Sequence, residues 1–229
     1  MRKVCIIILI ILLVSIPIII WLLRPKSNFQ YNRRKKVDKR LKTKSTQIIG
    51  NKNTPVYIID NFLTSEECNS LIKSIKNLSK STLTRYNGDK DFRTSQTGYF
   101  SNSLIEEKID SRICSLLGLN KELAETTQVQ KYDIGQQFKE HNDAFYEGLD
   151  DSFLKDKGQR SWTVMVYLND VKKGGETVFT KLNESISPKT GKAVVWSSID
   201  KDGNIDEDTK HKGSPVIMGS KYIITKWFH

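Results

Sequence analysis

The stretch HKGSPVIMGSKYIITKWFH, residues 211–229, decides the fold that this sequence predicts. From Lys221 onward it is rich in β-branched and aromatic residues, which is typical of a strand whose successive side chains point to opposite faces. If the face with Lys221 points into a barrel, this cation needs an anion beside it, because burying an unpaired charge is very costly. The two predicted faces carry Lys221, Ile223, Thr225 and Trp227, and Tyr222, Ile224, Lys226 and Phe228.

Other short strands are predicted upstream of this stretch, from about residue 126 onward. Turn signals separate them, among them Gly174-Gly175 and Gly219-Ser220, and two amphipathic helices with S/T-x-x-E capping boxes at Thr64 and Ser103 precede them. The sequence therefore predicts an α+β, mostly β fold, in which N-terminal helices support a jelly-roll or double-sheet core. The predicted strands span residues 127–132, 162–168, 176–179, 193–196, 216–218 and 222–228.

Charge is distributed very unevenly along the chain. The 229 residues carry a formal net charge of +11, yet residues 1–52 contain thirteen Lys/Arg and one acid, Asp38, whereas the remainder contains 24 bases and 25 acids. The bulk of the protein is therefore neutral, which argues against nucleic-acid binding by the folded part. Three cysteines, Cys5, Cys68 and Cys114, cannot form a disulfide framework, and the sequence leaves a Cys68–Cys114 bond open.

The N-terminal segment predicts a membrane anchor. Residues 4–23 contain no charge and are long enough to cross a hydrocarbon core of about 30 Å. A cleaved signal peptide is the weaker alternative, because no small-x-small cleavage site follows the apolar run. We expect an anchor at 1–23, a solvated basic stalk at 24–52 and one folded domain at 53–229.

Two features predict opposite orientations in the membrane. Ten Lys/Arg between residues 24 and 44, against Arg2 and Lys3 before the span, place the stalk and domain on the cytosolic side. The sequons that begin at Asn77 and Asn183 permit a luminal domain. The sequence alone favours the cytosolic side.

Three residues point to metal chemistry. His141 and Asp143 form a His-x-Asp element after a strand-like run, and His211 follows seventy residues later. Alone, a His-x-Asp element is typical of a solvated loop pair. Two imidazoles and one carboxylate on one face of an octahedron are, however, the ligand set of non-haem Fe(II) oxygenases.

With the residues around them, these elements resemble the prolyl 4-hydroxylases of the 2-oxoglutarate and Fe(II)-dependent dioxygenase superfamily. The resemblance covers residues 56–229 and implies a double-stranded β-helix, which agrees with the strand pattern. It is closer to the compact plant, algal and viral enzymes than to the animal multisubunit collagen enzymes, so we expect no obligatory partner subunit. The motifs are QVQKYDIG (128–135), HND (141–143), RSWTVMVYLN (160–169), GGETVF (174–179), PKTG (188–191) and HKGSPVIMGSKYIITKW (211–227).

The resemblance assigns roles to twelve residues. His141, Asp143 and His211 would bind iron, and Lys221 would bind the distal carboxylate of 2-oxoglutarate. Tyr132 and Thr177 would supply further hydroxyl groups to that carboxylate. The peptide groove would contain Arg93, Ser95, Glu125, Arg160, Trp227 and His229. The alternative for the groove set is that Trp227 belongs to the core, Arg160 and Glu125 are surface charges, and His229 is a frayed terminus.

The implied reaction is 4-hydroxylation of peptidyl proline in proline-rich or collagen-like proteins, as in procollagen-proline 4-dioxygenases. It consumes O2 and 2-oxoglutarate, releases succinate and CO2, and would use ascorbate as a reductant. Alternatives are the same chemistry on lysine or on a regulatory proline, and an inactive membrane-tethered binding module. Relatives work in the endoplasmic reticulum lumen, so we expect that location despite the basic stalk. Phe138 stands where the family often has Tyr. If the missing hydroxyl helps to hold the substrate, we expect a change in substrate affinity or sequence preference, but none in the binding of iron or 2-oxoglutarate.

Overall fold

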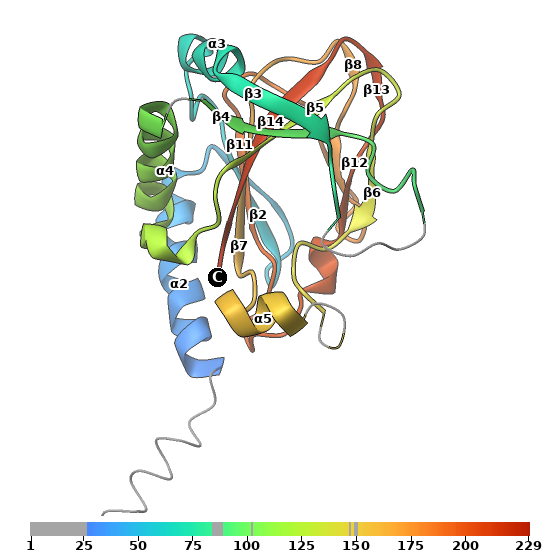
Figure 1. The fold of residues 1–229 in the computed structure, drawn as a ribbon. Helices are drawn as coiled ribbons and strands as arrows, with labels where there is room; N and C mark the ends of the chain where they lie inside the picture. The colour runs from blue at the N-terminus through green and yellow to red at the C-terminus, as the bar shows by residue number, and fades with distance from the viewer. Residues whose placement is uncertain (1–26, 84–88, 102, 147, 149–150) are drawn as a thin grey trace, which may run out of the picture.

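The computed structural model describes residues 27–83, 89–101, 103–146, 148 and 151–229. Its core consists of a large and a small antiparallel sheet, as in a jelly roll, with a short two-stranded pair beside them (Figure 1). The large sheet has the order β1 (Gln47–Gly50), β2 (Pro55–Ile59), β11 (Ala193–Ser197), β7 (Trp162–Tyr167), β14 (Lys221–Phe228), β5 (Gln128–Tyr132), β4 (Gln96–Phe100), β3 (Ile75–Lys80). The small sheet has the order β10 (Glu184–Ile186), β9 (Thr177–Phe179), β12 (His211–Gly213), β6 (Phe138–His141), and the pair is β13 (Val216–Met218) with β8 (Lys173–Gly174).

The predicted alternation along β14 is confirmed. Ile223 packs into the apolar cluster between the two sheets, whereas Ile224 packs into the cluster between the large sheet and the helices. The same division separates Val194 from Val195 on β11. The large sheet therefore has two buried faces, one toward the helices and one toward the interior in which the site lies.

The helical predictions are partly confirmed. Helix α3 (Ser65–Lys73) begins after Thr64, whose capping box with Glu67 is formed. Helix α4 (Ser103–Leu117) already includes Ser103, so that residue is not the cap. A further short helix, α5 (Asp151–Lys157), lies between β6 and β7 in the chain. Two 3-10 turns, η1 (Lys121–Leu123) and η2 (Glu207–Thr209), complete the helices.

The prediction of a solvated stalk over residues 24–52 is wrong for its larger part. Residues 27–44 form helix α2 (Ser27–Lys44), and β1 pairs with β2 along the large sheet. Val37 and Leu41 are fully buried against the core, and the Tyr57 hydroxyl donates to Asp38 at 2.8 Å. Two apolar residues four positions apart are enough to dock this helix, although the basic residues around them mask the pattern. The folded domain therefore begins before residue 53.

The predicted membrane anchor at residues 4–23 lies outside the described residues. Among the residues that the structure describes, no helix is both long and apolar enough to span a membrane. Cys68 and Cys114 are free thiols, and Cys68 lies on the buried face of α3, so the structure does not contain the disulfide that the sequence left open.

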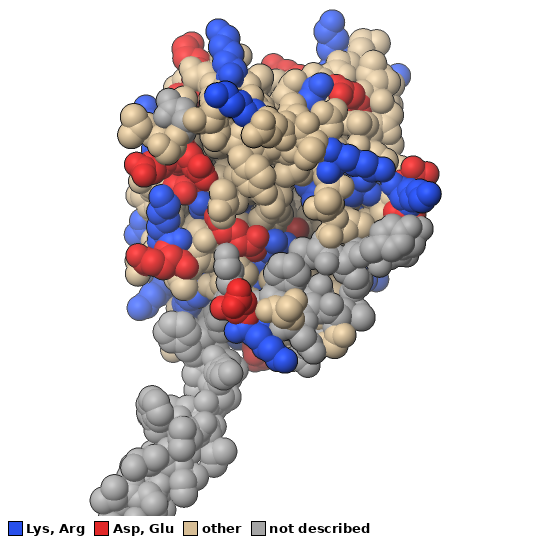
Figure 2. Space-filling model, in the orientation of Figure 1, with Lys and Arg blue, Asp and Glu red and all other residues tan. Residues whose placement is uncertain are grey.

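Charged residues of both signs are interspersed over the face seen in Figure 2, and uncharged residues form much of its centre. This agrees with the near-neutral balance of the chain beyond residue 52.

Candidate metal centre and its cavities

Two neighbouring strands of the small sheet bring the histidines together. In the antiparallel pair of β6 and β12, His211 and His141 are direct register partners, and their ring centroids are 4.3 Å apart. Each ring is oriented by a backbone carbonyl at Nδ1, from Lys139 at 2.8 Å for His141 and from Thr209 at 3.0 Å for His211. This leaves the two Nε2 atoms available as metal ligands.

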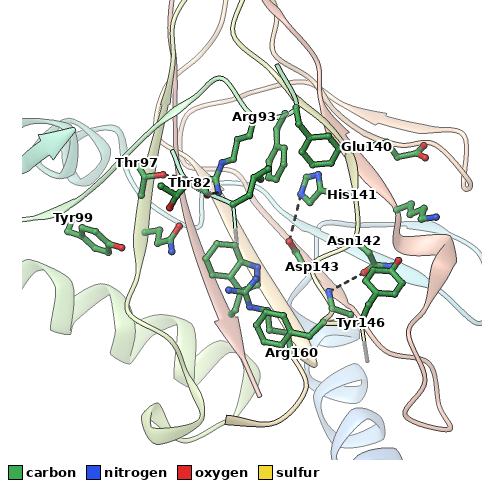
Figure 3. Close-up of a pocket in the computed structure, with 18 residues that line it drawn as sticks. Thr82, Arg93, Thr97, Tyr99, Glu140, His141, Asn142, Asp143, Tyr146 and Arg160 are labelled. Atoms are coloured by element: carbon green, nitrogen blue, oxygen red, sulfur yellow. Dashed lines mark hydrogen bonds and ion pairs between the residues drawn. The ribbon is translucent and has the colours of Figure 1, made fainter. Parts of the chain in front are cut away.

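Asp143 completes the group from the bend after β6. Its carboxylate accepts a hydrogen bond from the Thr163 hydroxyl at 2.7 Å, and its other oxygen lies 3.8 Å from Nε2 of His141 (Figure 3). One ligand atom from each of His141, Asp143 and His211 lies within 4.8 Å of the others. The predicted triad is therefore brought together, and Thr163 orients its carboxylate as a partner behind a metal ligand does.

The protonation states suit a divalent metal. Burial, together with the nearby His211, lowers the pKa of His141 to about 3, so its ring is neutral. Burial by itself would raise the pKa of Asp143, but the two histidines and the Thr163 hydroxyl hold this pKa below its usual value. Neutral imidazole and ionised carboxylate are the forms that bind Fe(II). The donor set fits that ion.

A small inner chamber of about 40 Å³ lies between the sheets beside the triad. Lys221 lies at its wall, 1% exposed, and its ammonium donates to the Gly175 carbonyl at 2.9 Å. The rings of Tyr132 and Tyr167 lie within 4.8 and 5.7 Å of this ammonium. Burial lowers the pKa of Lys221 to about 7, which a bound carboxylate would reverse. The chamber therefore offers a buried cation to an acidic small molecule.

The two hydroxyl groups predicted for this chamber are present. Tyr132 on β5 is the register partner of Lys221, and Thr177 on β9 lines the same wall. The sequence prediction gave no role to Tyr167, whose hydroxyl donates to Thr177 at 2.7 Å and so orients it. Alternation along β7 could have indicated this residue, because Thr163, Met165 and Tyr167 share one face.

Phe138 lines the inner chamber next to His141. Its ring stacks on His141 with centroids 3.6 Å apart, and the guanidinium of Arg93 lies 4.8 Å from its centroid. Its ring therefore contacts a metal ligand and a cation together, and it lines both cavities.

A larger outer cavity of about 610 Å³ shares His141 and Asp143 with the inner chamber. Aromatic rings line much of it, from Phe92, Tyr99, Phe138, Phe145, Tyr146 and Trp227. In Figure 3, Arg93 lies above Asp143 and Arg160 lies below it. An elongated ligand could therefore reach the triad past aromatic surface.

The six residues predicted for a peptide groove separate into two sets. Arg93, Arg160 and Trp227 line the outer cavity. Ser95 is fully buried behind Arg93, whose Nε donates to its hydroxyl at 3.2 Å. Glu125 and His229 are not among the lining residues and lie behind Arg160. Three of the six residues therefore line the cavity. Ser95 and Glu125 contact the two arginines from behind, and His229 contacts Glu125.

Glu125 holds Arg160 by a bidentate ion pair, with N–O distances of 2.5 and 2.8 Å. His229 contacts the same carboxylate at 3.2 Å, and its Nδ1 lies 2.9 Å from the Gly158 carbonyl. Burial alone would raise the pKa of Glu125, but the hydrogen bonds from His229 and Arg160 lower it to about 2. These contacts exclude the alternatives of free surface charges and a frayed C-terminus. The Arg160 guanidinium packs 4.2 Å above the Trp227 ring.

Known proteins resemble this chain in sequence. A family model described as the 2OG-Fe(II) oxygenase superfamily matches residues 127–229. Probable prolyl 4-hydroxylase 8 of Arabidopsis thaliana is 35% identical over 200 residues, which cover 76% of this chain and 68% of that protein. Prolyl 4-hydroxylase subunit alpha-2 of Gallus gallus is 35% identical over 173 residues, which cover 69% of this chain and 32% of the subunit.

Solved structures resemble it in fold. The viral collagen prolyl hydroxylase of Paramecium Bursaria Chlorella virus-1, in its 2OG complex, matches with a TM-score of 0.59 at 28% identity, over 75% of this chain and 94% of that one. A Trichoplax adhaerens prolyl hydroxylase, solved with a hypoxia inducible factor peptide fragment, matches with a TM-score of 0.60 at 18% identity, over 90% and 94%. At 18% identity, the match to the Trichoplax adhaerens protein shows similarity of fold only.

Proposed function

The chain belongs to the prolyl 4-hydroxylase family within the 2OG-Fe(II) oxygenase superfamily, and we propose that it hydroxylates C4 of peptidyl proline in proline-rich or collagen-like proteins. One observation carries this proposal. A metal-ligand triad lies between an inner chamber with a buried lysine and an outer, aromatic cavity. The arrangement would let a small acidic co-substrate in one cavity and a peptide in the other reach the same metal.

His141, Asp143 and His211 would hold Fe(II), which supplies oxygen activation coupled to decarboxylation of 2-oxoglutarate. Lys221, with the hydroxyls of Tyr132 and Thr177, would bind the distal carboxylate of that co-substrate, because a cation and neutral donors together satisfy a buried carboxylate. Overall, peptidyl proline, O2 and 2-oxoglutarate become hydroxyproline, succinate and CO2. The protein itself would bind and orient the metal, the co-substrate and the peptide, and would exclude water from the site.

The outer cavity supports a proline-containing peptide as substrate. Pro-rich segments form extended polyproline II helices that dock against aromatic-lined grooves. Nε1 of Trp227 is buried and has no hydrogen-bond partner among the described residues, so it can donate to a peptide carbonyl. Trp227 also lines both cavities, so a peptide bound to it would lie close to the triad.

Peptide-stimulated turnover tests this function. Full-length protein in detergent, with Fe(II), ascorbate and 2-oxoglutarate, is expected to release CO2 several-fold faster with a proline-rich or collagen-like peptide. Mass spectrometry should then show +16 Da on proline. The matched control is the same peptide with every proline replaced by alanine, which should neither stimulate turnover nor gain mass. A +16 Da change on lysine instead, or no stimulation by any proline peptide, would contradict the proposal.

For the location we propose a membrane-anchored enzyme with its catalytic domain in the endoplasmic reticulum lumen. The uncharged run at residues 4–23 supports the anchor, and family precedent supports the lumen. Asn77 and Asn183 are both exposed, so both sequons are accessible to glycosylation. Expression in eukaryotic cells is expected to give a mass shift that is sensitive to endoglycosidase and disappears in the double variant Asn77→Gln, Asn183→Gln. A domain digested by protease outside intact microsomes would contradict the luminal side.

A further inference from the structure

Helix α2 carries a buried cation that binds parts of the chain far from it in sequence. Arg34 is 7% exposed, and its guanidinium donates to the Ile199 carbonyl at 2.6 Å and to the Asn53 carbonyl at 2.7 Å. Asp38 and Asp206 lie 3.9 and 4.0 Å away. Burying a guanidinium is costly unless it is hydrogen-bonded, so its placement here requires these two loops to keep their positions.

The same two loops meet at Asp206, just before η2. The Asp206 carboxylate accepts from the Thr54 hydroxyl at 3.0 Å and from the Asp208 backbone at 3.2 Å. Its backbone carbonyl accepts from the Asn142 side chain at 3.2 Å and from the Thr209 hydroxyl at 2.6 Å. One residue therefore holds four different groups, and Thr54 lies next to Asn53, which Arg34 binds.

Two of these groups belong to residues close to the metal ligands in the chain, Asn142 and Thr209. Asn142 lies between His141 and Asp143 in the chain. Its hydrogen bond to the Asp206 carbonyl therefore restrains the backbone that orients both ligands. Thr209 provides the carbonyl that orients the ring of His211 through Nδ1. The three ligands come from two segments, and Asp206 connects these segments through its backbone carbonyl.

We propose that Arg34 and Asp206 are positioning residues for the metal centre, so that the N-terminal helix α2 contributes to metal affinity without touching the metal. Figure 1 shows α2 on one side of the large sheet and β6 and β12 on the other, so the connection runs through the loops. Partners behind metal ligands typically change metal affinity by about 10–100-fold when removed. The inference rests on the proposed function only in taking His141, Asp143 and His211 as the metal ligands.

A matched pair of variants on one helix tests the inference. Arg34→Met removes both donors and keeps an apolar stem, whereas Arg40→Met removes a guanidinium that donates to the Ser115 carbonyl at 2.6 Å, on α4. In full-length protein in detergent, without 2-oxoglutarate, Co(II) binding is followed by calorimetry and by the cobalt absorption spectrum. We expect Arg34→Met to weaken Co(II) binding about tenfold. Arg40→Met should bind Co(II) within about twofold of the wild type, although both changes lower the melting temperature.

A second variant covers the case in which Arg34→Met does not fold. Thr54→Val keeps the shape of a buried side chain and removes only the hydroxyl that donates a hydrogen bond to the Asp206 carboxylate. This change is expected to weaken Co(II) binding at least threefold. Co(II) affinity equal to that of the wild type in Thr54→Val, or in a folded Arg34→Met protein, would overturn the inference. A wild-type protein that binds Co(II) normally but hydroxylates no proline would overturn the proposed function and leave this inference standing. A wild type that binds no Co(II) would overturn both.

Discussion

Replacing His141 by alanine is expected to abolish prolyl hydroxylation and 2-oxoglutarate turnover together. His141 supplies one of three ligand atoms that lie within 4.8 Å of one another, and its removal leaves the triad incomplete for Fe(II). The loss should exceed the roughly 100-fold that follows from removing a residue behind the ligands. Succinate production and hydroxyproline content, measured on the same samples, report the two activities.

The third histidine provides the control for this substitution. His229→Ala removes an imidazole that contacts Glu125, not the metal, and should leave peptide-independent 2-oxoglutarate turnover and Co(II) binding intact. A His141→Ala protein that is folded by circular dichroism and keeps full activity would sink the assignment of the triad.

Replacing Lys221 by alanine is expected chiefly to raise the 2-oxoglutarate requirement. Lys221 is the cation at the wall of the inner chamber, and removing one partner of a buried charge pair costs about 2–5 kcal/mol. At 1.4 kcal/mol per factor of ten, this is a rise in KM for 2-oxoglutarate of between about 30-fold and several thousand-fold. The control Lys189→Ala changes an exposed lysine and should leave this KM unchanged. An unchanged KM for 2-oxoglutarate in Lys221→Ala would show that Lys221 does not bind the carboxylate of this co-substrate.

The same residue predicts a pH dependence of co-substrate binding. In the free protein burial lowers the pKa of Lys221 to about 7, so its ammonium loses its proton as the pH rises through that value. Only the protonated form attracts a carboxylate, so the dissociation constant for 2-oxoglutarate should increase above pH 7 by up to about tenfold per pH unit. Lys221→Met should remove this dependence, whereas a flat profile in the wild type would contradict it.

Strand alternation predicted much of the fold and the inner part of the site. Period two along β14 placed Lys221 and Trp227 on one face, and both line the inner chamber. This could be predicted because the direction of a side chain on a strand depends only on local backbone geometry. The resemblance to prolyl 4-hydroxylases added the roles that alternation cannot assign, including those of Tyr132 and Thr177.

The N-terminal helix was mispredicted for a physical reason. The basic composition of residues 24–52 indicates solvation, yet Val37 and Leu41 bury one side of α2 and Arg34 is held by carbonyls from Asn53 and Ile199. Those carbonyls belong to loops whose positions follow from the sheet, so nothing near Arg34 in the sequence identifies them. Assays are therefore best made on a chain that keeps α2.

By itself, the sequence predicted six of the strands, β5, β7, β9, β11, β13 and β14, and the inward-facing Lys221, because these depend on local periodicity. The candidate metal ligands were predicted from ordered motifs, through the resemblance to prolyl 4-hydroxylases. Only the tertiary structure decided that β12 pairs with β6, so that His211 meets His141 across one strand pair. It also decided that Glu125 and His229 support Arg160, and that Asp206 joins both ligand segments to α2. These contacts connect residues far apart in the chain, and they form only when the core brings the distant segments together.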